Sequence, residues 1–323
     1  MEKSITTFQN YLEVIKPKID ERIKYIAEDQ SVDPDVVPLL LKGKRMRGGL
    51  LMLVYESLSQ KDEYNKALDL ACAVEFAHSA SLILDDMIDE DETRRGLPTV
   101  HITHGHKKAM LETIGILSLP YKLASSIGTS YTSMLADTQR RMVSGAVKEL
   151  FENPDLPASK LYDMIITHKT GRLFSLAAKW GGMFSLKLPE ESPTPIKIGE
   201  YGLHCGKAMQ ISDDITDLYK IMDGKKTSNF GSEMLLLSCV GIDGLAKEFV
   251  HDLKKRDLDF TKITNLKHTI HNTLVGMHDK EIEESISYIN EISHLIIKEK
   301  NEERLISAPR DIVTLVKGSD DKN

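Results

Sequence analysis

Hydrophobic and polar positions follow a helical pattern along most of the chain. Residues 39–97 and 196–308 contain none of the eleven prolines, and both spans are rich in Leu, Ile, Ala, Met, Glu and Lys, which form helices or are tolerated in them. No stretch alternates apolar and polar residues between Val-, Ile- and Thr-rich runs joined by Asn-Gly or Asp-Gly, so hairpins are not expected. The pattern predicts an all-α protein.

Turn-forming residues divide this pattern into roughly ten long helices. The breaks are expected at Pro17, Asp33-Pro34, Gly96-Leu97-Pro98, Asn153-Pro154 to Pro157, Pro189 to Pro195 and Asp223-Gly224. No flexible linker divides the chain, and only a short segment from about residue 318 has the composition of a polar tail. We therefore expect a single helical domain over residues 1–323.

Composition and charge restrict the class of protein. The chain has 323 residues, 41% hydrophobic and 28% charged, which is typical of neither a disordered segment nor a membrane protein. Its 42 Lys and Arg against 49 Asp and Glu give a net charge of −7, which disfavours a nucleic-acid partner. No uninterrupted apolar run approaches the ~18 residues that span a bilayer, so no membrane span is expected. Three widely spaced cysteines without a CxxC pair indicate free thiols and a cytoplasmic location.

The first of two acidic clusters consists of Asp85, Asp86 and Asp89. Asp85 and Asp89 are four residues apart and therefore lie on one helix face, with Cβ atoms ~5–6 Å apart. The fifteen residues 70–84 before them carry a single charge, Glu75. Carboxylates that emerge from such an apolar segment repel one another, and we expect a cation to neutralise them.

The second cluster, Asp213, Asp214 and Asp217, has the same spacing and also follows a nearly uncharged turn. Carboxylate oxygens suit Mg²⁺, which binds one or two carboxylates and keeps water or phosphate oxygens in its other positions. Two such faces opposite each other can hold a diphosphate through shared metal ions. A solvated acidic helix face would explain one cluster as well, but two identical clusters on apolar stems favour the metal site.

Basic side chains that can bind phosphate occur at three places. Four of them fall within six residues between apolar runs: Lys42, Lys44, Arg45 and Arg47. Arg offers a rigid fork and Lys a compact charge to phosphate oxygens. Arg94 and Arg95 follow Asp89 within a few residues and form a second basic group. Lys169, followed by Thr170, is the third, although spacing alone does not exclude an ordinary charged helix position.

Four motifs together resemble those of the trans-type, head-to-tail isoprenyl diphosphate synthases. They are GKRMR, DDMID followed by RRG, KTGRLF and QISDDITD, in that family's order, over about residues 40–230. Two DDxxD motifs are specific to these synthases, because the related terpene cyclases typically keep only one. The resemblance implies the type I isoprenoid synthase fold, a single bundle of long helices around a deep apolar cavity, and a homodimer.

The resemblance also implies a role for each residue at a matching position. Mg²⁺, as three ions with substrate bound, would be held by Asp85, Asp89 and Asp213, assisted by Asp86, Asp214 and Asp217. Isopentenyl diphosphate would be held by Lys44, Arg47, His78 and Arg95. The allylic diphosphate would be held by Arg94, Lys169 and Lys225 or Lys226, beside Thr170 and Gln210. His78 lies two helical turns before Asp85, which is also compatible with a buried core histidine.

The implied reaction condenses isopentenyl diphosphate with dimethylallyl, geranyl or farnesyl diphosphate. The allylic C–O bond ionises, the isopentenyl double bond attacks the carbocation, and proton loss leaves a product five carbons longer. A terpene cyclase and a non-catalytic subunit of a heteromeric synthase are the alternatives. Lys44, Arg47 and Arg95 favour a second diphosphate site over a cyclase, and the two intact acidic clusters favour a catalytic chain.

The sequence departs from the family pattern at several positions. Gly48 replaces a common Pro, Leu84 a frequent His and Ala146 a usual Gln. The segment MLETIGILS lacks the family's Gly-Asp, and the stretch over residues 218–232 is shortened. These departures bear on the assignment of Lys225 or Lys226 and on the substrate preference. They leave both acidic clusters intact.

Ala80 and Ser81 predict a long product. They lie five and four residues before Asp85, where short-chain members of the family often have an aromatic residue. The cavity floor is therefore not set there, and we expect geranylgeranyl diphosphate (C20) or a longer product. The Ala80→Phe variant is predicted to give a shorter product when the dephosphorylated products are sized by chromatography. An unchanged length would place the cavity elsewhere.

Overall fold

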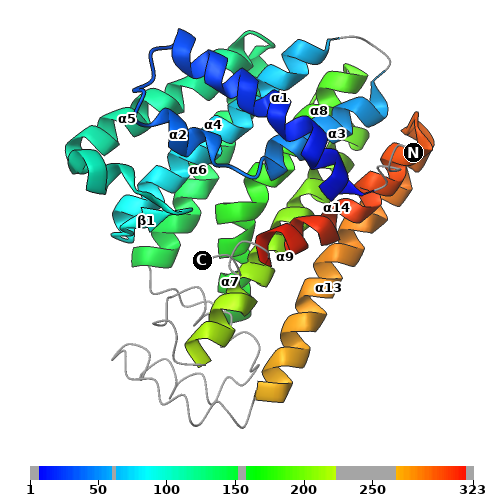
Figure 1. Ribbon diagram of the computed structural model, residues 1–323. Coiled ribbons are helices and arrows are strands. Elements are labelled where there is room, and N and C mark those ends of the chain that lie inside the picture. Colours follow the sequence, from blue (N-terminus) through cyan, green and yellow to red (C-terminus); the bar gives the residue numbers. More distant parts are fainter. Residues whose placement is uncertain (1–6, 60–62, 152–157, 223–266, 318–323) are drawn as a thin grey trace, which may run out of the picture.

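The computed structural model describes residues 7–59, 63–151, 158–222 and 267–317, and these are almost entirely helical (Figure 1). The helices are α1 (Phe8–Asp29), α2 (Val37–Leu41), α3 (Met46–Leu58), α4 (Tyr64–Ile88), α5 (Val100–Ser125), α6 (Thr129–Phe151), α7 (Ala158–Ile166), α8 (Arg172–Leu186), α9 (Pro193–Met222), α13 (Lys267–Ile292) and α14 (Glu299–Lys317). A π-helical turn, η1 (Thr167–Gly171), joins α7 to α8, and a 3-10 turn, η2 (Ser293–Leu295), follows α13. The predicted all-α class is confirmed.

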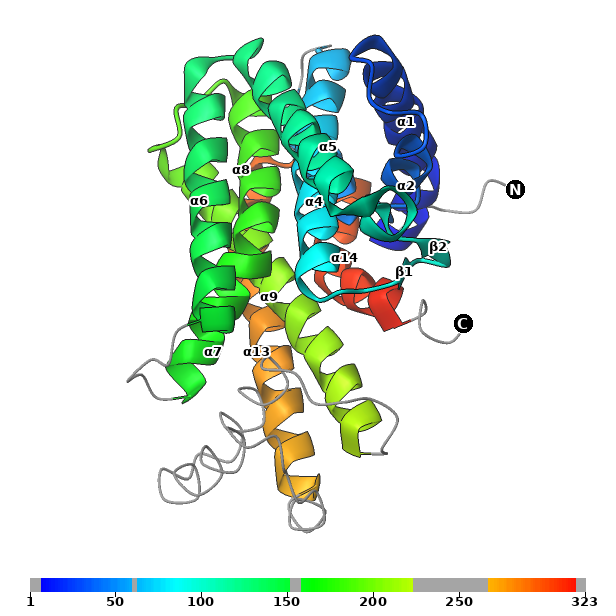
Figure 2. The same ribbon diagram turned by 90° about the vertical axis from the view of Figure 1, so that its left-hand side faces the viewer.

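The helix α4 lies in the core of the bundle. Its residues 70–77 are all buried, so this part of the helix has no solvent-exposed face. Both α3 and α5 pack against it, and Figure 2 shows α4, α8 and α6 side by side. Among the described helices, only α4 is long and apolar enough to cross a membrane, and 67% of its most apolar stretch is buried inside the protein. The core helix of a soluble protein passes the same test.

Glycines allow α9 to approach α8 and η1 at backbone distance. A Cβ atom at Gly202 would lie 2.4 Å from the carbonyl oxygen of Phe174, which is closer than such atoms can come. A Cβ atom at Gly206 would lie 2.9 Å from the Cα atom of Gly171. Because glycine has no Cβ, η1 rests directly on α9, the helix that carries the second acidic cluster.

The break predicted at Pro17 is wrong, because α1 continues through this residue. Pro17 lies on the exposed face, where water can hydrogen-bond the carbonyl group that loses its N–H partner. The buried side chains of Ile15, Ile19 and Ile23 hold the two halves of the helix against the core. Packing therefore outweighs the local cost of the proline.

The expectation of no hairpin is wrong at one place. Strands β1 (Thr93–Arg94) and β2 (Leu97–Pro98) pair antiparallel. The two residues between them, Arg95 and Gly96, have φ angles of 51° and 73°, and positive φ at both positions is typical of a type I′ turn. The prediction relied on Asn-Gly or Asp-Gly as the hairpin signal, whereas the turn in this chain is Arg95-Gly96.

Candidate active site

The first acidic cluster lies at the carboxyl-terminal end of α4. Asp85 and Asp86 are in the last turn of the helix, and Asp89 is its C-cap. Burial raises the pKa of Asp85; the nearby charge of Lys169 lowers it, and that of Asp89 raises it further. Asp86 is 4% exposed and forms an ion pair with Arg94. The hairpin therefore places Arg94 beside the first acidic cluster, which comes before it in the sequence.

The second acidic cluster lies near the carboxyl-terminal end of α9. Burial raises the pKa of Asp214 to about 6, although two hydrogen bonds oppose this shift. The hydroxyl of Tyr162 on α7 donates to Oδ2 of Asp214 at 2.7 Å, and Nε2 of Gln210 donates to Oδ1 at 3.0 Å. Asp213 and Asp217 are partly exposed on the same helix.

Lys169 of η1 lies between the two clusters. Its Nζ atom is 2.8 Å from Oε2 of Glu149 on α6. Its positive charge also lowers the pKa of Asp85 in the first cluster and of Asp214 in the second. One ammonium group therefore acts on a carboxylate of α4 and on a carboxylate of α9, so the ends of both helices lie within electrostatic reach of η1.

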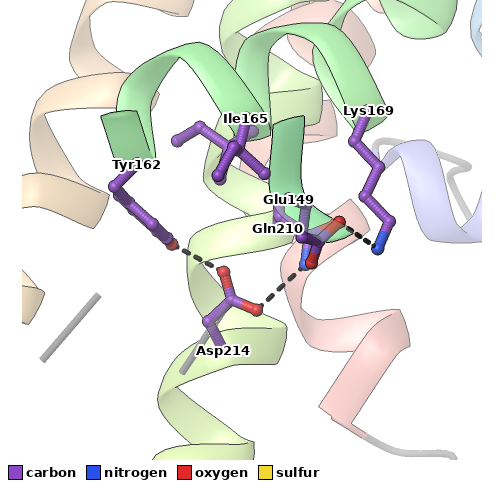
Figure 3. Close-up of a pocket in the computed structure, with 7 residues that line it drawn as sticks. Glu149, Tyr162, Ile165, Lys169, Gln210 and Asp214 are labelled. Atoms are coloured by element: carbon purple, nitrogen blue, oxygen red, sulfur yellow. Dashed lines mark hydrogen bonds and ion pairs between the residues drawn. The ribbon is translucent and has the colours of Figure 1, made fainter. Parts of the chain in front are cut away.

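A pocket opens beside Lys169 (Figure 3). It is lined by Glu149, Tyr162, Ile165, Ile166, Lys169, Gln210 and Asp214. The hydroxyl of Thr170, which is buried, donates to Oε1 of Gln210 at 2.6 Å, and this bond directs the amide nitrogen of Gln210 toward Asp214. The deep apolar cavity expected below Ala80 stays a prediction.

Arg47 and His78 form a basic region close to the aspartates. Arg47 is buried, and its guanidinium lies over the ring of Phe174, 4.5 Å from the centroid. Burial lowers the pKa of Arg47 to about 10, and its Nε has no hydrogen-bond partner within the described ranges. A buried guanidinium with an unused donor suits an anionic ligand. Burial, followed by the charges of Arg47 and Arg95, lowers the pKa of His78, which is therefore neutral at pH 7.

The other predicted cations differ in their surroundings. Nζ of Lys44 donates to the carbonyl oxygen of Leu315 in α14 at 2.6 Å. Arg95 is exposed at the tip of the hairpin turn. Arg45 is 1% exposed and forms ion pairs in the core, so its guanidinium is not available to a phosphate group. Lys225 and Lys226 lie outside the described residues.

Glu149 and Tyr162 are site residues that the sequence reasoning missed. Tyr162 precedes Lys169 by seven residues, and this two-turn spacing is a signal that would have placed both on one helix face. Glu149 has no comparable signal, because it approaches Lys169 only through the packing of α6 against η1.

The carboxylates of the two clusters suit Mg²⁺. Burial raises the pKa values of Asp85, Asp86 and Asp214. The negative charge of each of these carboxylates is therefore not fully stabilised by nearby cations and water. In the part of the chain that the structure describes, no three His, Cys, Asp or Glu side chains come close enough to hold an ion. Mg²⁺ binds by one or two carboxylates together with water and phosphate oxygens, so this donor set fits it.

These features define a helical bundle with two acidic clusters, a pocket beside Lys169 and a buried arginine with an unused donor, and the chain belongs to the polyprenyl synthetase family, whose model matches residues 36–229. It is 31% identical to a short chain isoprenyl diphosphate synthase of Methanocaldococcus jannaschii, over 85% of this chain and 81% of that one. It is 29% identical to a geranylgeranyl diphosphate synthase of Pseudescherichia vulneris, over 77% and 85% respectively. A decaprenyl diphosphate synthase of Rhodobacter capsulatus has the same fold, with a TM-score of 0.75 at 20% identity over 95% of this chain and 99% of that chain. The predicted family and fold are confirmed.

The Tyr162→Phe variant tests the hydrogen bond to Asp214. A lost hydrogen bond to a charged buried group costs about 1–3 kcal/mol, so we expect the free energy of unfolding to fall by about this amount. Tyr121→Phe is the control, because it removes a hydrogen bond to the neutral amide of Gln139 and should cost less. Urea unfolding followed by circular dichroism measures both variants, and equal losses would contradict the role given to Tyr162.

Proposed function

We propose that the protein is an Mg²⁺-dependent prenyltransferase that condenses isopentenyl diphosphate with an allylic diphosphate. The main support is the position of Lys169, whose charge acts on both acidic clusters beside a pocket. The comparisons support prenyl transfer, since the relatives include geranylgeranyl diphosphate synthases. Other relatives are named octaprenyl, geranylfarnesyl and nonaprenyl diphosphate synthases, so these names do not fix the product length.

The two acidic clusters would hold the metal. The proposed ligands are Asp85, Asp89 and Asp213, with Asp86, Asp214 and Asp217 assisting, for three ions when substrate is present. When bound, Mg²⁺ acts as a Lewis acid and stabilises the negative charge of the departing diphosphate.

Two groups of basic side chains would bind the two substrates at separate positions. Lys169 and Arg94, with Lys225 or Lys226, bind the allylic diphosphate near the aspartates. Lys44, Arg47, His78 and Arg95 bind isopentenyl diphosphate. The unused Nε donor of Arg47 and a neutral His78, which can donate one hydrogen bond, both suit phosphate oxygens.

The reaction then follows from where charge develops. Fixed donors around the leaving diphosphate favour cleavage of the allylic C–O bond, because they stabilise negative charge where it forms. The Thr170 hydroxyl and the Gln210 amide line the site beside the resulting allylic cation. The isopentenyl double bond attacks this cation, and the departed diphosphate accepts the proton. The apolar cavity predicted below Ala80 would exclude water, which would otherwise capture the cation.

We infer a product of C20, geranylgeranyl diphosphate, or longer. The support is the small size of Ala80 and Ser81 in the helical turn before Asp85, and Ala80 itself is fully buried in α4. We also infer a single domain and a cytoplasmic location, from composition and the resemblance.

We infer that the protein is a homodimer. A group of large apolar side chains is exposed on two consecutive helices, α5 and α6: Ile102, Met110, Leu111, Ile114, Val143 and Val147. Several large apolar side chains exposed on neighbouring helices are typical of a protein interface. Equilibrium sedimentation of the full chain is expected to give twice the monomer mass of 36.3 kDa, and a single species at the monomer mass would contradict the inference.

The function is tested by incubating the purified protein with Mg²⁺, labelled isopentenyl diphosphate and a C5, C10 or C15 allylic primer. We expect elongated products in all runs with an accepted primer and none with a chelator. Asp85→Asn and Asp213→Asn should each lower kcat by about 100-fold or more, because each removes a proposed ligand of the Mg²⁺ that stabilises the leaving diphosphate. Glu92→Gln, an exposed neutralisation close to the first cluster, is the matched control.

Other outcomes of the same assay would identify the alternatives. A cyclic hydrocarbon formed without isopentenyl diphosphate indicates a terpene cyclase. Activity that appears only after another subunit is added indicates a regulatory partner.

A further inference from the structure

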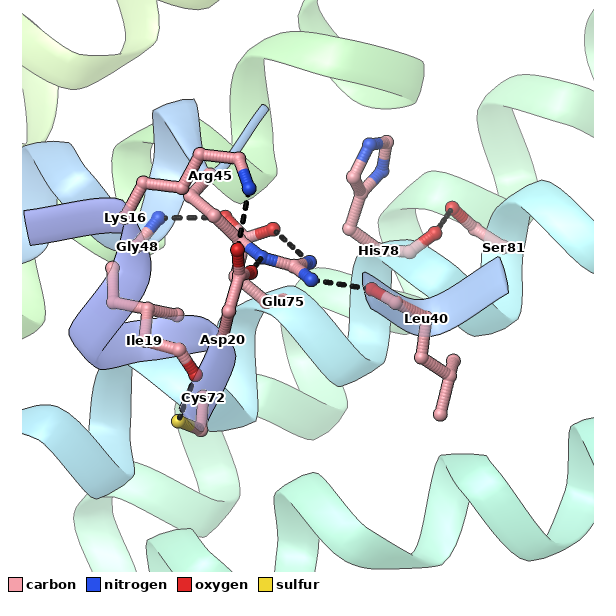
Figure 4. A network of polar contacts seen from close by, with 10 residues as sticks. All are labelled: Lys16, Ile19, Asp20, Leu40, Arg45, Gly48, Cys72, Glu75, His78 and Ser81. Carbon is pink, nitrogen blue, oxygen red and sulfur yellow. Dashed lines mark hydrogen bonds and ion pairs between the residues drawn. The ribbon is translucent and has the colours of Figure 1, made fainter. Parts of the chain in front are cut away.

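Glu75 is a buried charge for which the proposed reaction has no role. It is 2% exposed in the middle of α4. Oε1 of its carboxylate accepts the backbone N–H of Gly48 at 2.8 Å, and Oε2 lies 3.4 Å from Nη1 of Arg45 (Figure 4). One side chain of α4 therefore binds two positions of the segment that precedes and begins α3.

Arg45 is held from three directions. Its Nε donates to Oδ1 of Asp20 on α1 at 2.6 Å, one terminal nitrogen faces Glu75, and the other donates to the carbonyl oxygen of Leu40. The backbone of Arg45 has φ of 61°, a left-handed conformation that is unfavourable for a residue with a Cβ. Such strain persists where surrounding contacts enforce it, and it is common at functional sites.

The bond from Gly48 depends on a departure from the family pattern. Proline, which is common at this position in the family, has no N–H and cannot donate to Glu75. In this chain one carboxylate therefore ties down both Arg45 and Gly48. Lys44 and Arg47 lie directly beside these two anchored residues, so the conformation of this turn determines where their side chains point.

We propose that Asp20, Arg45 and Glu75 are positioning residues for the second diphosphate site, because they hold the turn that presents Lys44 and Arg47. The inference rests on the proposed function, which assigns Lys44 and Arg47 to isopentenyl diphosphate. None of the three positioning residues needs to touch the substrate.

Two matched variants separate positioning from stability. Asp20→Asn weakens the ion pair between α1 and Arg45. Asp69→Asn weakens an equivalent ion pair between α4 and Arg22 of α1, in which Nε of Arg22 lies 2.7 Å from Oδ1 of Asp69. The two aspartates are similarly exposed, at 23% and 18%, but the second pair does not reach the basic turn.

We expect Asp20→Asn to raise KM for isopentenyl diphosphate about five- to tenfold, since misplaced donors lose part of their charge-assisted hydrogen bonds. KM for the allylic primer should change less than about twofold. Asp69→Asn should leave both KM values near those of the natural chain. Thermal melting of both variants gives their loss of stability, and the same KM values in both would overturn the proposal.

Glu75→Gln is the second variant. It keeps an acceptor for Gly48 but removes the charge opposite Arg45, so the same selective rise in KM is expected. A parallel rise for both substrates would indicate a structural role alone and overturn the proposal. Asp20→Asn, at the partly exposed end of the network, decides the question even where Glu75→Gln is too unstable to purify.

Calorimetric titration with isopentenyl diphosphate distinguishes this inference from the proposed function. If the natural chain binds isopentenyl diphosphate but elongates no primer, the proposed function fails. The inference still stands in that case when Asp20→Asn binds isopentenyl diphosphate more weakly than Asp69→Asn, and equal binding by the two variants refutes it.

Discussion

The site depends on charged groups that the fold withdraws from water at the ends of apolar helices. Burial of a carboxylate or guanidinium is costly unless opposite charge is close. The pKa values of Asp85, Asp86 and Asp214 are raised for this reason, and the pKa of Arg47 is lowered for the same reason. In such a water-poor space each charge acts more strongly on a ligand than it would at the surface.

The packing of the bundle sets where these charges meet. The glycine contact between α9 and η1 places Thr170 within hydrogen-bond distance of Gln210, and that bond in turn directs Gln210 toward Asp214. The π-helical turn itself is a rare form that recurs at functional sites, where it displaces side chains from the regular helical register. The orientation of Gln210 at the pocket therefore depends on the close backbone contact between α9 and η1.

Much of the site could be predicted from the spacing of residues along helices. Four-residue spacing placed Asp85 and Asp89 on one face. The apolar stem before them indicated burial, which holds for Asp86, whereas Asp89 at the C-cap is exposed. The pairing of Lys169 with Glu149 could not be predicted in this way, because the two residues lie on different elements that meet only in the folded bundle. The Arg95-Gly96 turn and the continuous helix through Pro17 show the same limit, since context decided against the usual residue preference in both.

Arg45 illustrates why composition alone does not identify a ligand. It stands in a run of cations that all suit phosphate, yet its left-handed backbone and the carboxylates of Asp20 and Glu75 direct it into the core. A short basic segment thus contains two kinds of cation, one paired inside the protein and others near the reaction site. Only the three-dimensional arrangement of opposite charges separates the two kinds.

The same arrangement leaves the two halves of the site with opposite excess charge. Around Glu75 there are three guanidinium groups, Arg45, Arg47 and Arg95, within reach of its charge. At the ends of α4 and α9 carboxylates predominate. In the proposed function, a diphosphate would relieve the first excess and divalent cations the second, and the charge of Asp213, which acts on Arg47, links the two halves. Binding of a metal and a diphosphate together would therefore compensate charges that neither ligand would compensate alone.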